Sequence, residues 1–211
     1  MTDHLSNSQI DLLLHYQIPY EDHLKLFRHF KNCPYCCTKL LSDFSFNIST
    51  KKEDYYYTDF NQPIDHRIIA SQDRLIAIQF LSKNRITPNN ITIRKTAPIK
   101  KVAAVLKHYF EENPINENLL PVLQFRHLSD FAARVYLLTY FIPFGRVLTY
   151  GELAILAGSK GAARAVGQIL KRNPFPIIIP CHRVLGQNKA LTGFAGGLEI
   201  KKKLLQLEQS L

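Results

Sequence analysis

The chain has 211 residues, 46% of them hydrophobic, and a formal net charge of +10 at pH 7. This length suffices for one good core or two small ones, and no apolar run is long enough to cross a membrane. Three of the four cysteines lie within residues 33–37 and no basic, apolar leader opens the chain, which argues against a secreted disulfide framework. We therefore expect a cytoplasmic, monomeric globular protein.

Residues 1–45 are predicted to be helical and to form a small module. In the pattern His29-x3-Cys33-x2-Cys36, three side chains can point at one centre from a helix end, and His4 offers a fourth ligand. The pattern resembles the zinc-binding anti-sigma fold, which implies a structural zinc ion and a protein partner for this module. The alternative is a set of thiols with incidental histidines.

Residues 46–54 are polar and predict a linker. The next segment alternates runs of β-branched and aromatic residues with turn formers, which predicts strands over 55–60, 67–71 and 75–80. An amphipathic helix is expected over 99–110. Residues 55–128 are therefore predicted to form an α/β domain, which has no obvious chemistry and is assigned a scaffolding role.

From residue 129 onward the pattern is helical, and hydroxyl residues mark where two helices begin. Ser129 is predicted to cap a helix that ends before Pro143, and Thr149 to cap a second helix over 150–157. A glycine-containing turn and a helix over 162–171 follow, which together match a helix-turn-helix plan.

The basic residues are concentrated in the second half of the chain. Residues 120–211 contain 12 Lys and Arg against 4 Asp and Glu, whereas residues 1–119 contain 15 against 13. This asymmetry predicts a polyanionic partner such as DNA for the second half. A basic surface that only aids solubility is the alternative, and charge alone does not decide between them.

The helix over 162–171 carries small residues, Ala163 and Gly167 among them, on both sides of Arg164. Small side chains would let this helix lie close to DNA, or equally close to another helix. By itself Arg164 is a solvated arginine or a phosphate contact.

Cys181 is the only cysteine after residue 37, and His182 follows it directly. Pro174 and Pro176 exclude a helix before it, so the apolar run at 177–179 is predicted to be a short buried strand or turn. A thiol is a nucleophile only as the thiolate, so a neighbouring proton acceptor matters. The alternative, favoured for an isolated cysteine, is a small buried apolar residue.

Several spaced motifs of residues 129–208 occur in one order. They are Phe131–Val135, Ile142–Gly145, Thr149–Gly151, Ala162–Gly167, Asn173–Pro174, Pro180–Val184 and Thr192–Leu198. This pattern closely resembles the O6-alkylguanine-DNA alkyltransferases, or methylated-DNA–protein-cysteine methyltransferases. The resemblance is weaker over residues 55–128. It implies a ribonuclease-H-like α/β domain followed by a helical domain, 129–211, that contains the helix-turn-helix.

The resemblance also implies a reaction and its catalytic residues. Cys181 would attack the alkyl group on O6 of guanine, and on O4 of thymine, in double-stranded DNA after the base is flipped out. His182 would take the thiol proton through a water, Glu208 would orient His182, and Asn173 would fix the active-site turn. Tyr150 would donate a proton toward the base.

Further residues are implied at the DNA and base contacts. Arg164 would fill the gap left by the flipped nucleotide, and Tyr150 would crowd the phosphate. The remaining DNA contacts are expected at Thr149, Ala163 and Gly167, and the base contacts at Val184, Phe194, Ala195 and Gly196. Phe194 and Ala195 replace a tyrosine and a serine that occur in the family, so the alkyl size that fits is left open.

The thioether formed on Cys181 would be inert, so each molecule would act once, and no cofactor is needed for the transfer. Two other functions are open at this stage. One is a non-catalytic sensor of alkylated DNA, although such sensors lack the cysteine that is present here. The other is a regulatory protein that acts through the N-terminal module.

Overall fold

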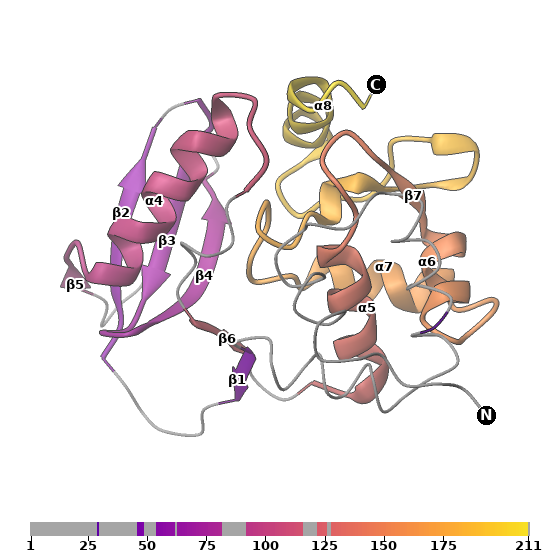
Figure 1. The fold of residues 1–211 in the computed structure, drawn as a ribbon, viewed down its shortest axis with the longest axis horizontal. Coiled ribbons are helices and arrows are strands. Elements are labelled where there is room, and N and C mark those ends of the chain that lie inside the picture. Colours follow the sequence, from indigo (N-terminus) through magenta and orange to yellow (C-terminus); the bar gives the residue numbers. More distant parts are fainter. Residues whose placement is uncertain are drawn as a thin grey trace.

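The computed structural model describes residues 29, 46–48, 54–61, 63–81, 92–115, 122–125 and 128–210. Figure 1 shows two regions side by side: a sheet with one helix, here called the sheet region (46–125), and a bundle of short helices, the helical region (128–210). No helix within these ranges is long and apolar enough to span a membrane. The expected zinc ligands His4, Cys33 and Cys36 lie outside the described residues.

The sheet region contains a mixed sheet in the order β1-β6-β4-β3-β2-β5. Its strands are β1 (Phe46–Ile48), β2 (Tyr56–Phe60), β3 (His66–Ala70), β4 (Arg74–Phe80), β5 (Thr92–Ile93) and β6 (Val122–Phe125). Strands β2, β3 and β4 form an antiparallel meander, and β5, β6 and β1 join with parallel pairing. The meander agrees closely with the strands predicted from the sequence.

The sequence prediction of a linker over residues 46–54 needs a correction. Residues 46–48 form β1, which pairs in parallel with β6 at the end of the sheet. The sequence there, Phe-Asn-Ile, alternates apolar and polar residues as a strand does, but three residues are too few to stand out from a polar segment. Only long-range pairing with residues 122–125 reveals this strand.

Helix α4 (Ala97–Phe110) covers one face of the sheet (Figure 1). Pro98 lies in its first turn, where no intrahelical N–H is needed. Its buried residues recur every three or four positions and are Pro98, Ile99, Val102, Val105, Leu106 and Tyr109. This spacing places them along one stripe that packs on the sheet, as the amphipathic pattern predicts.

The helical region consists of four α-helices and short connections. The helices are α5 (Asp130–Tyr140), α6 (Tyr150–Leu156), α7 (Ala163–Lys171) and α8 (Leu198–Leu207). Between α7 and α8 lie two single turns of 3-10 helix, η2 (Cys181–Arg183) and η3 (Gln187–Lys189), and the strand β8 (Val184–Leu185), which pairs with β7 (Leu148–Thr149).

Both predicted helix caps are present. The Ser129 hydroxyl accepts a hydrogen bond from Ala132 N at the start of α5. Thr149 and Glu152 form a reciprocal capping box at the start of α6, with Glu152 N 3.1 Å from Thr149 Oγ1 and Thr149 N 2.7 Å from Glu152 Oε2. These local contacts set where α6 begins, and therefore where Tyr150 lies.

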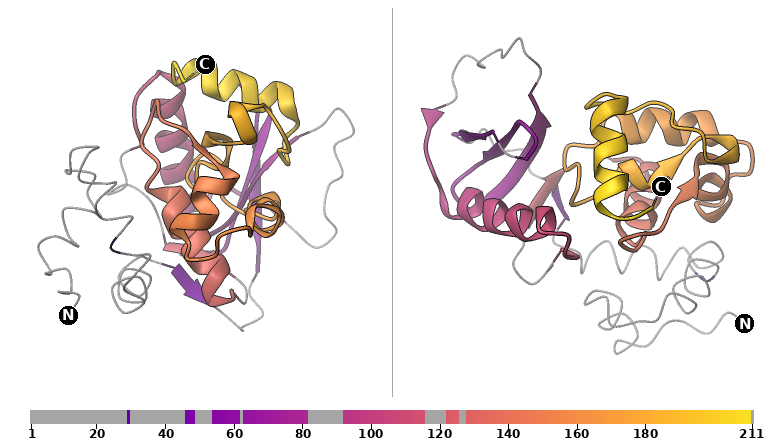
Figure 2. Two further views of the ribbon diagram at one scale, coloured as in Figure 1. Left: turned by 90° about the vertical axis from the view of Figure 1, so that its right-hand side faces the viewer. Right: turned by 90° about the horizontal axis from the view of Figure 1, so that it is seen from above.

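The two regions share one continuous hydrophobic core. Ile78 N, in β4, donates to Pro174 O across the junction at 2.7 Å, and the rings of Phe80 and Phe194 lie 5.6 Å apart. Figure 2 shows the helical region beside the sheet in two further views. The turn that leads to Cys181 is therefore braced directly by the sheet.

Candidate active site

Cys181 is the first residue of η2 and is 6% exposed. Asn173, two residues after the end of α7, holds the turn that leads to it: its side-chain amide donates to Ile179 O at 2.8 Å and to Cys181 Sγ at 3.1 Å. Within this turn Ile177 is fully buried at φ +74°, a conformation that β-branched residues rarely adopt. Such local strain persists only where the surroundings hold it, which points to a turn built to place the thiol.

The thiol is protonated at rest. Burial raises the pKa of Cys181 to about 11, although the hydrogen bond from Asn173 and the charge of Lys201 both act in the opposite direction. Because the thiolate is the nucleophile, the proton must leave as the thiol reacts. The site therefore requires a proton acceptor.

The next residue, His182, is fully buried and has that capacity. Its Nε2 lies 2.8 Å from Glu208 Oε1, and since a carboxylate can only accept, Nε2 carries the hydrogen. Burial lowers the pKa of His182, and the charges of Arg183 and Lys201 lower it further, against the raising effect of Glu208. The imidazole is thus neutral, and its Nδ1, which has no partner among the described residues, is left with a free lone pair.

Glu208 is buried directly after α8 and accepts hydrogen bonds from three side chains. Arg183 donates to both its oxygens, through Nε at 2.8 Å and Nη2 at 2.9 Å, and the Tyr109 hydroxyl donates to Oε1 at 2.6 Å. Burial opposes the charged form, but the charges and hydrogen bonds of His182 and Arg183 outweigh it and hold the pKa of Glu208 far below its usual value. The carboxylate is therefore ionised at neutral pH.

The segment from Ile142 to Gly145 contacts both Glu208 and Arg183. Gly145 has φ +74°, and a Cβ at that position would lie 3.2 Å from Glu208 O, so only glycine fits without strain. The Arg183 guanidinium also donates to Ile142 O, one turn before this glycine. The fold therefore holds Glu208 where it accepts the hydrogen bond from His182, the contact that the resemblance implies.

Lys201, within α8, holds the segment that follows the thiol. It is fully buried, and its Nζ donates to Val184 O at 2.7 Å and to Thr192 O at 2.8 Å. Burial lowers the pKa of Lys201 to about 8, and Cys181 acts in the opposite direction when it is ionised. The Lys201 ammonium group therefore connects the segment after Cys181, through Val184, to the loop that follows η3, through Thr192.

A pocket of about 500 Å³ opens in front of the thiol. Its walls come from α6, α7, the thiol turn and the loop before α8, and comprise Tyr150, Arg164, Gly167, Gln168, Leu170, Lys171, Cys181, Thr192, Gly193 and Phe194. The Tyr150 hydroxyl donates to Gly193 O at 3.1 Å, and burial raises the pKa of Tyr150 to about 12. Five residues that the sequence analysis assigned to the site therefore line one pocket: Tyr150, Arg164, Gly167, Cys181 and Phe194.

Several other expected contacts do not line this pocket. Val184 is buried with its carbonyl bound to Lys201, and Thr149 uses its hydroxyl in the capping box. Gly196 packs against the sheet region, where an added Cβ would lie 2.5 Å from a Phe80 ring carbon. Ala195 and Ala163 are likewise absent from the pocket walls.

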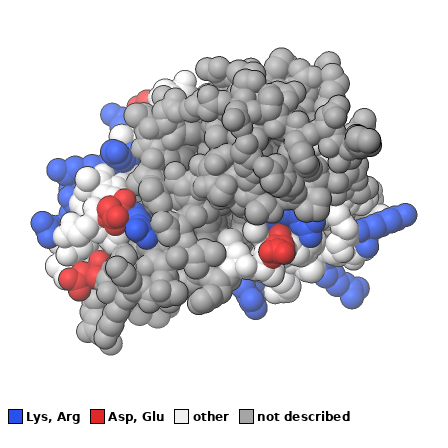
Figure 3. Space-filling model, turned by 60° about the horizontal axis from the view of Figure 1, so that its bottom comes forward, with Lys and Arg blue, Asp and Glu red and all other residues white. Residues whose placement is uncertain are grey.

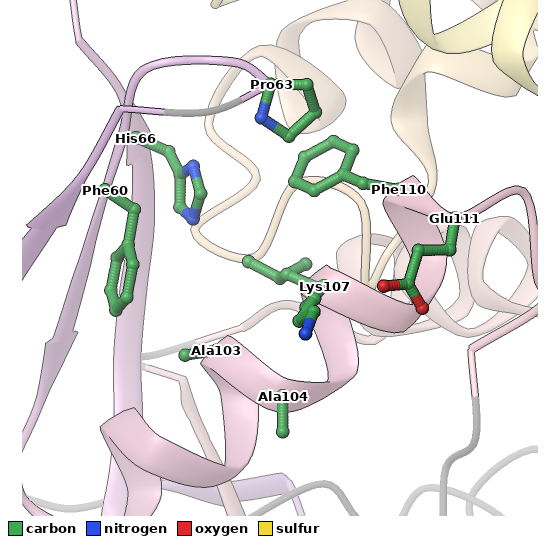
Figure 4. A pocket seen from close by; sticks show the side chains of 9 residues that line it. Phe60, Pro63, His66, Ala103, Ala104, Lys107, Phe110 and Glu111 are labelled. Carbon is green, nitrogen blue, oxygen red and sulfur yellow. The ribbon is translucent and has the colours of Figure 1, made fainter.

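A second pocket, of about 620 Å³, lies between α4 and the edge of β2 and β3 (Figure 4). The His66 ring stacks on Phe60 with centroids 5.2 Å apart, and its Nδ1 lies 2.7 Å from Ile64 O. No cysteine of the described residues lines this pocket, and Lys107 and Glu111 lie at its helix side. Cys181 lines the first pocket.

The sequence reasoning did not assign Tyr109, Arg183 and Lys201 to the site. Two of them, Lys201 and Tyr109, carried a signal. Lys201 shares the apolar face of α8 with Leu204 and Leu205, three and four residues later, where a lysine needs polar partners. Tyr109 lies on the buried stripe of α4, and a buried tyrosine hydroxyl usually finds a hydrogen-bond partner.

These features define a class of protein: one in which a buried thiol, followed directly by a neutral histidine, lines a pocket between a helix pair and a loop. A family model described as "6-O-methylguanine DNA methyltransferase, DNA binding domain" matches residues 130–210. The match begins with α5 and ends after Glu208, so it covers the whole pocket.

Relatives extend the match into the sheet region. The chain is 37% identical to the constitutive methylated-DNA–protein-cysteine methyltransferase of Bacillus subtilis, over 73% of this chain and 95% of that protein. It is 36% identical to the enzyme of that name from Methanosarcina acetivorans, over 74% of this chain and 99% of that protein. The crystal structure of Mycobacterium tuberculosis OGT in complex with DNA is similar with a TM-score of 0.63 and 32% identity, over 74% of this chain and 93% of that one.

The chain belongs to the methylated-DNA–protein-cysteine methyltransferase family. Its α/β architecture, a mixed sheet with helices, agrees with that of the similar solved structures. The zinc module at residues 1–45 stays a prediction, because three of its four ligands lie outside the described residues.

Proposed function

We propose that this protein repairs DNA by direct reversal, moving an alkyl group from O6 of guanine, and from O4 of thymine, to Cys181. The observation that carries the proposal is the pocket in which the buried thiol, Tyr150 and Arg164 meet beside α7. Each molecule would act once, because the thioether product has no route back to the thiol. The comparisons support the reaction class, since the named relatives are methylated-DNA–protein-cysteine methyltransferases.

The depth of the thiol supports base flipping. A base inside a duplex cannot reach the sulfur of a cysteine that is only 6% exposed within a pocket. The alkylated nucleotide must therefore rotate out of the stack, at a cost of a few kcal/mol that a poorly paired base lowers. Helix α7 would lie against the DNA, with Arg164 exposed on it and able to fill the space that the base leaves.

The transfer itself breaks one bond and forms one. As the thiol proton passes through a bridging water to His182 Nδ1, Cys181 Sγ attacks the alkyl carbon and the bond from that carbon to O6 breaks. Tyr150 donates a proton to the departing guanine and is reprotonated from solvent, while His182 releases the proton it took to solvent and returns to its neutral form. Overall the thiol hydrogen is exchanged for the alkyl group, and guanine gains one proton.

Charge alone does not delimit the DNA-binding face. On the side shown in Figure 3, Lys and Arg side chains project from the described residues at several places, with acidic groups between them. The finer assignment of α6 and α7 as the DNA-binding helix-turn-helix therefore depends on the position of Arg164 at the pocket.

Stoichiometric methylation tests the proposed function. Mixing the protein with an excess of duplex that contains O6-methylguanine should add one methyl group per molecule, located by peptide mass spectrometry on Cys181. The reason is that the acceptor is consumed. Unmodified protein that still binds the duplex would favour the lesion-sensor function, and more than one repaired base per molecule would contradict irreversible transfer.

Arg164→Ala should slow transfer from duplex DNA by about 10- to 100-fold, since a stacking contact with a base contributes about 1–3 kcal/mol. Transfer from the free base O6-benzylguanine should change by less than about 2-fold, because no nucleotide is flipped. Rapid-quench measurement of both rates makes the comparison. Arg172→Ala, an exposed arginine directly after α7 that does not line the pocket, is the control. Equal losses on the two substrates would place Arg164 in the chemistry instead.

A further inference from the structure

Tyr109 crosses from the sheet region into the proton-transfer network of the helical region. It lies near the C-terminal end of α4 and is fully buried. Its hydroxyl donates to Glu208 Oε1 at 2.6 Å and lies 3.4 Å from His182 Nε2. Through these contacts a side chain of the sheet region takes part in the hydrogen-bond network of Glu208, His182 and Arg183.

We propose that Tyr109 is a positioning residue for alkyl transfer, which acts through Glu208 to set how strongly His182 binds a proton. This inference rests on the proposed function and deepens it. It gives the sheet region a part in the chemistry, where the sequence suggested only a scaffold.

The hydrogen bonds at Glu208 Oε1 provide the mechanism. This single oxygen accepts from His182 Nε2 at 2.8 Å, from Arg183 Nη2 at 2.9 Å and from the Tyr109 hydroxyl. A carboxylate that already accepts several donors has less negative charge to offer each of them. Tyr109 and Arg183 together therefore weaken the pull of Glu208 on the imidazole proton, so that His182 stays neutral and ready to accept the thiol proton.

The hydroxyl of Tyr109 is a permanent donor. Burial, and then the charge and hydrogen bond of Glu208, raise the pKa of Tyr109 well above its usual value. The ring is fixed as well, with edge contacts to Phe110 and Phe144 at centroid distances of 5.5 and 6.0 Å. A phenylalanine at this position would keep the ring packing and lose only the hydroxyl.

The sign of the effect follows from the groups around His182. Glu208 raises the pKa of His182, whereas Arg183 and Lys201 lower it. Without the Tyr109 hydroxyl, Glu208 Oε1 interacts more strongly with the imidazolium form, and the pKa of His182 rises. A larger share of the protein then carries a protonated, inactive His182 at mildly acidic pH.

Tyr109→Phe should therefore move the acid limb of the rate profile to higher pH, by on the order of one unit. The single-turnover rate of methyl transfer from duplex DNA should be measured from pH 5 to 9, with the free base O6-benzylguanine run in parallel. At the alkaline end the variant should react within about 2-fold of the wild type. The same shift with both substrates is expected, because Tyr109 acts on the proton acceptor and touches no DNA.

Tyr57→Phe is the matched control, since Tyr57 is a buried tyrosine of β2 in the same region and is 6% exposed. Its profile should coincide with that of the wild type. Two results for Tyr109→Phe would overturn the inference. One is an acid limb at the same pH as in the wild type, and the other is a rate lowered equally at every pH together with a lower Tm. If either result is obtained while Cys181 of the wild type is still methylated, the proposed function stands. A wild-type protein that accepts no methyl group refutes the proposed function itself.

Discussion

Cys181→Ala should abolish alkyl transfer completely while leaving the affinity for duplex DNA within about 2-fold of the wild type. The sulfur is the acceptor atom, and Cys181 is the one free cysteine of the described residues. Its removal leaves Tyr150 and Arg164 in place on α6 and α7, where they form the mouth of the pocket. Mass spectrometry after incubation with O6-methylguanine duplex gives the first readout, and fluorescence anisotropy on the same duplex gives the second.

The fold should tolerate this change. The sulfur is small, and truncating a buried side chain to alanine costs in proportion to the atoms removed, about 1 kcal/mol here. A Tm within a few degrees of the wild type is therefore expected, which separates loss of the acceptor from loss of the fold. Methyl transfer that survives in Cys181→Ala would show that another residue accepts the alkyl group, and the assignment of the nucleophile would be wrong.

Local features of the fold could be predicted from the sequence because their causes are local. Helices α5 and α6 begin directly after the hydroxyl residues chosen as caps, Ser129 and Thr149. In each case the signal lies within a few residues of the element it specifies. Strand β1 was missed because its partner, β6, lies more than seventy residues further along the chain.

The residues of the site likewise fall into two groups: those that a sequence motif displays and those whose contacts depend on long-range packing. Cys181 and His182 are adjacent, and Asn173 lies only eight residues before the thiol, so a motif can display all three. Tyr109 is 99 residues from Glu208, and its contact depends on how α4 packs beside the helical region. A pattern of apolar spacing shows that such a tyrosine is buried, but not what its hydroxyl meets.

Glu208→Gln should be the most damaging substitution for stability. Glu208 is 2% exposed and neutralises Arg183, which is 4% exposed and would otherwise be a buried, unpaired charge. Breaking a buried ion pair by removing one partner costs about 3–5 kcal/mol, which for a chain of this size lowers Tm by roughly 6–20 °C. The amide also presents donors where His182 and Tyr109 already donate, so transfer should slow by about 100-fold or more wherever the variant is folded.

The pH dependence of this loss has a definite sign. Because the pKa of Glu208 is depressed in the folded chain, its contribution to stability is complete above the unfolded value of about 4.3 and is lost as the pH falls through the lower, folded value. The difference in Tm between wild type and Glu208→Gln should therefore be largest near neutral pH and shrink below about pH 4. Differential scanning calorimetry across that range measures it.

Glu199→Gln supplies the control, because Glu199 lies exposed in the first turn of the same helix, α8. It should change stability by no more than about 0.5 kcal/mol at any pH, as surface substitutions generally do. If Glu208→Gln behaves like Glu199→Gln in both Tm and transfer rate, the carboxylate neither holds Arg183 nor orients His182. The proton acceptor for Cys181 would then have to be sought elsewhere, and the part proposed for Tyr109 would fall with it.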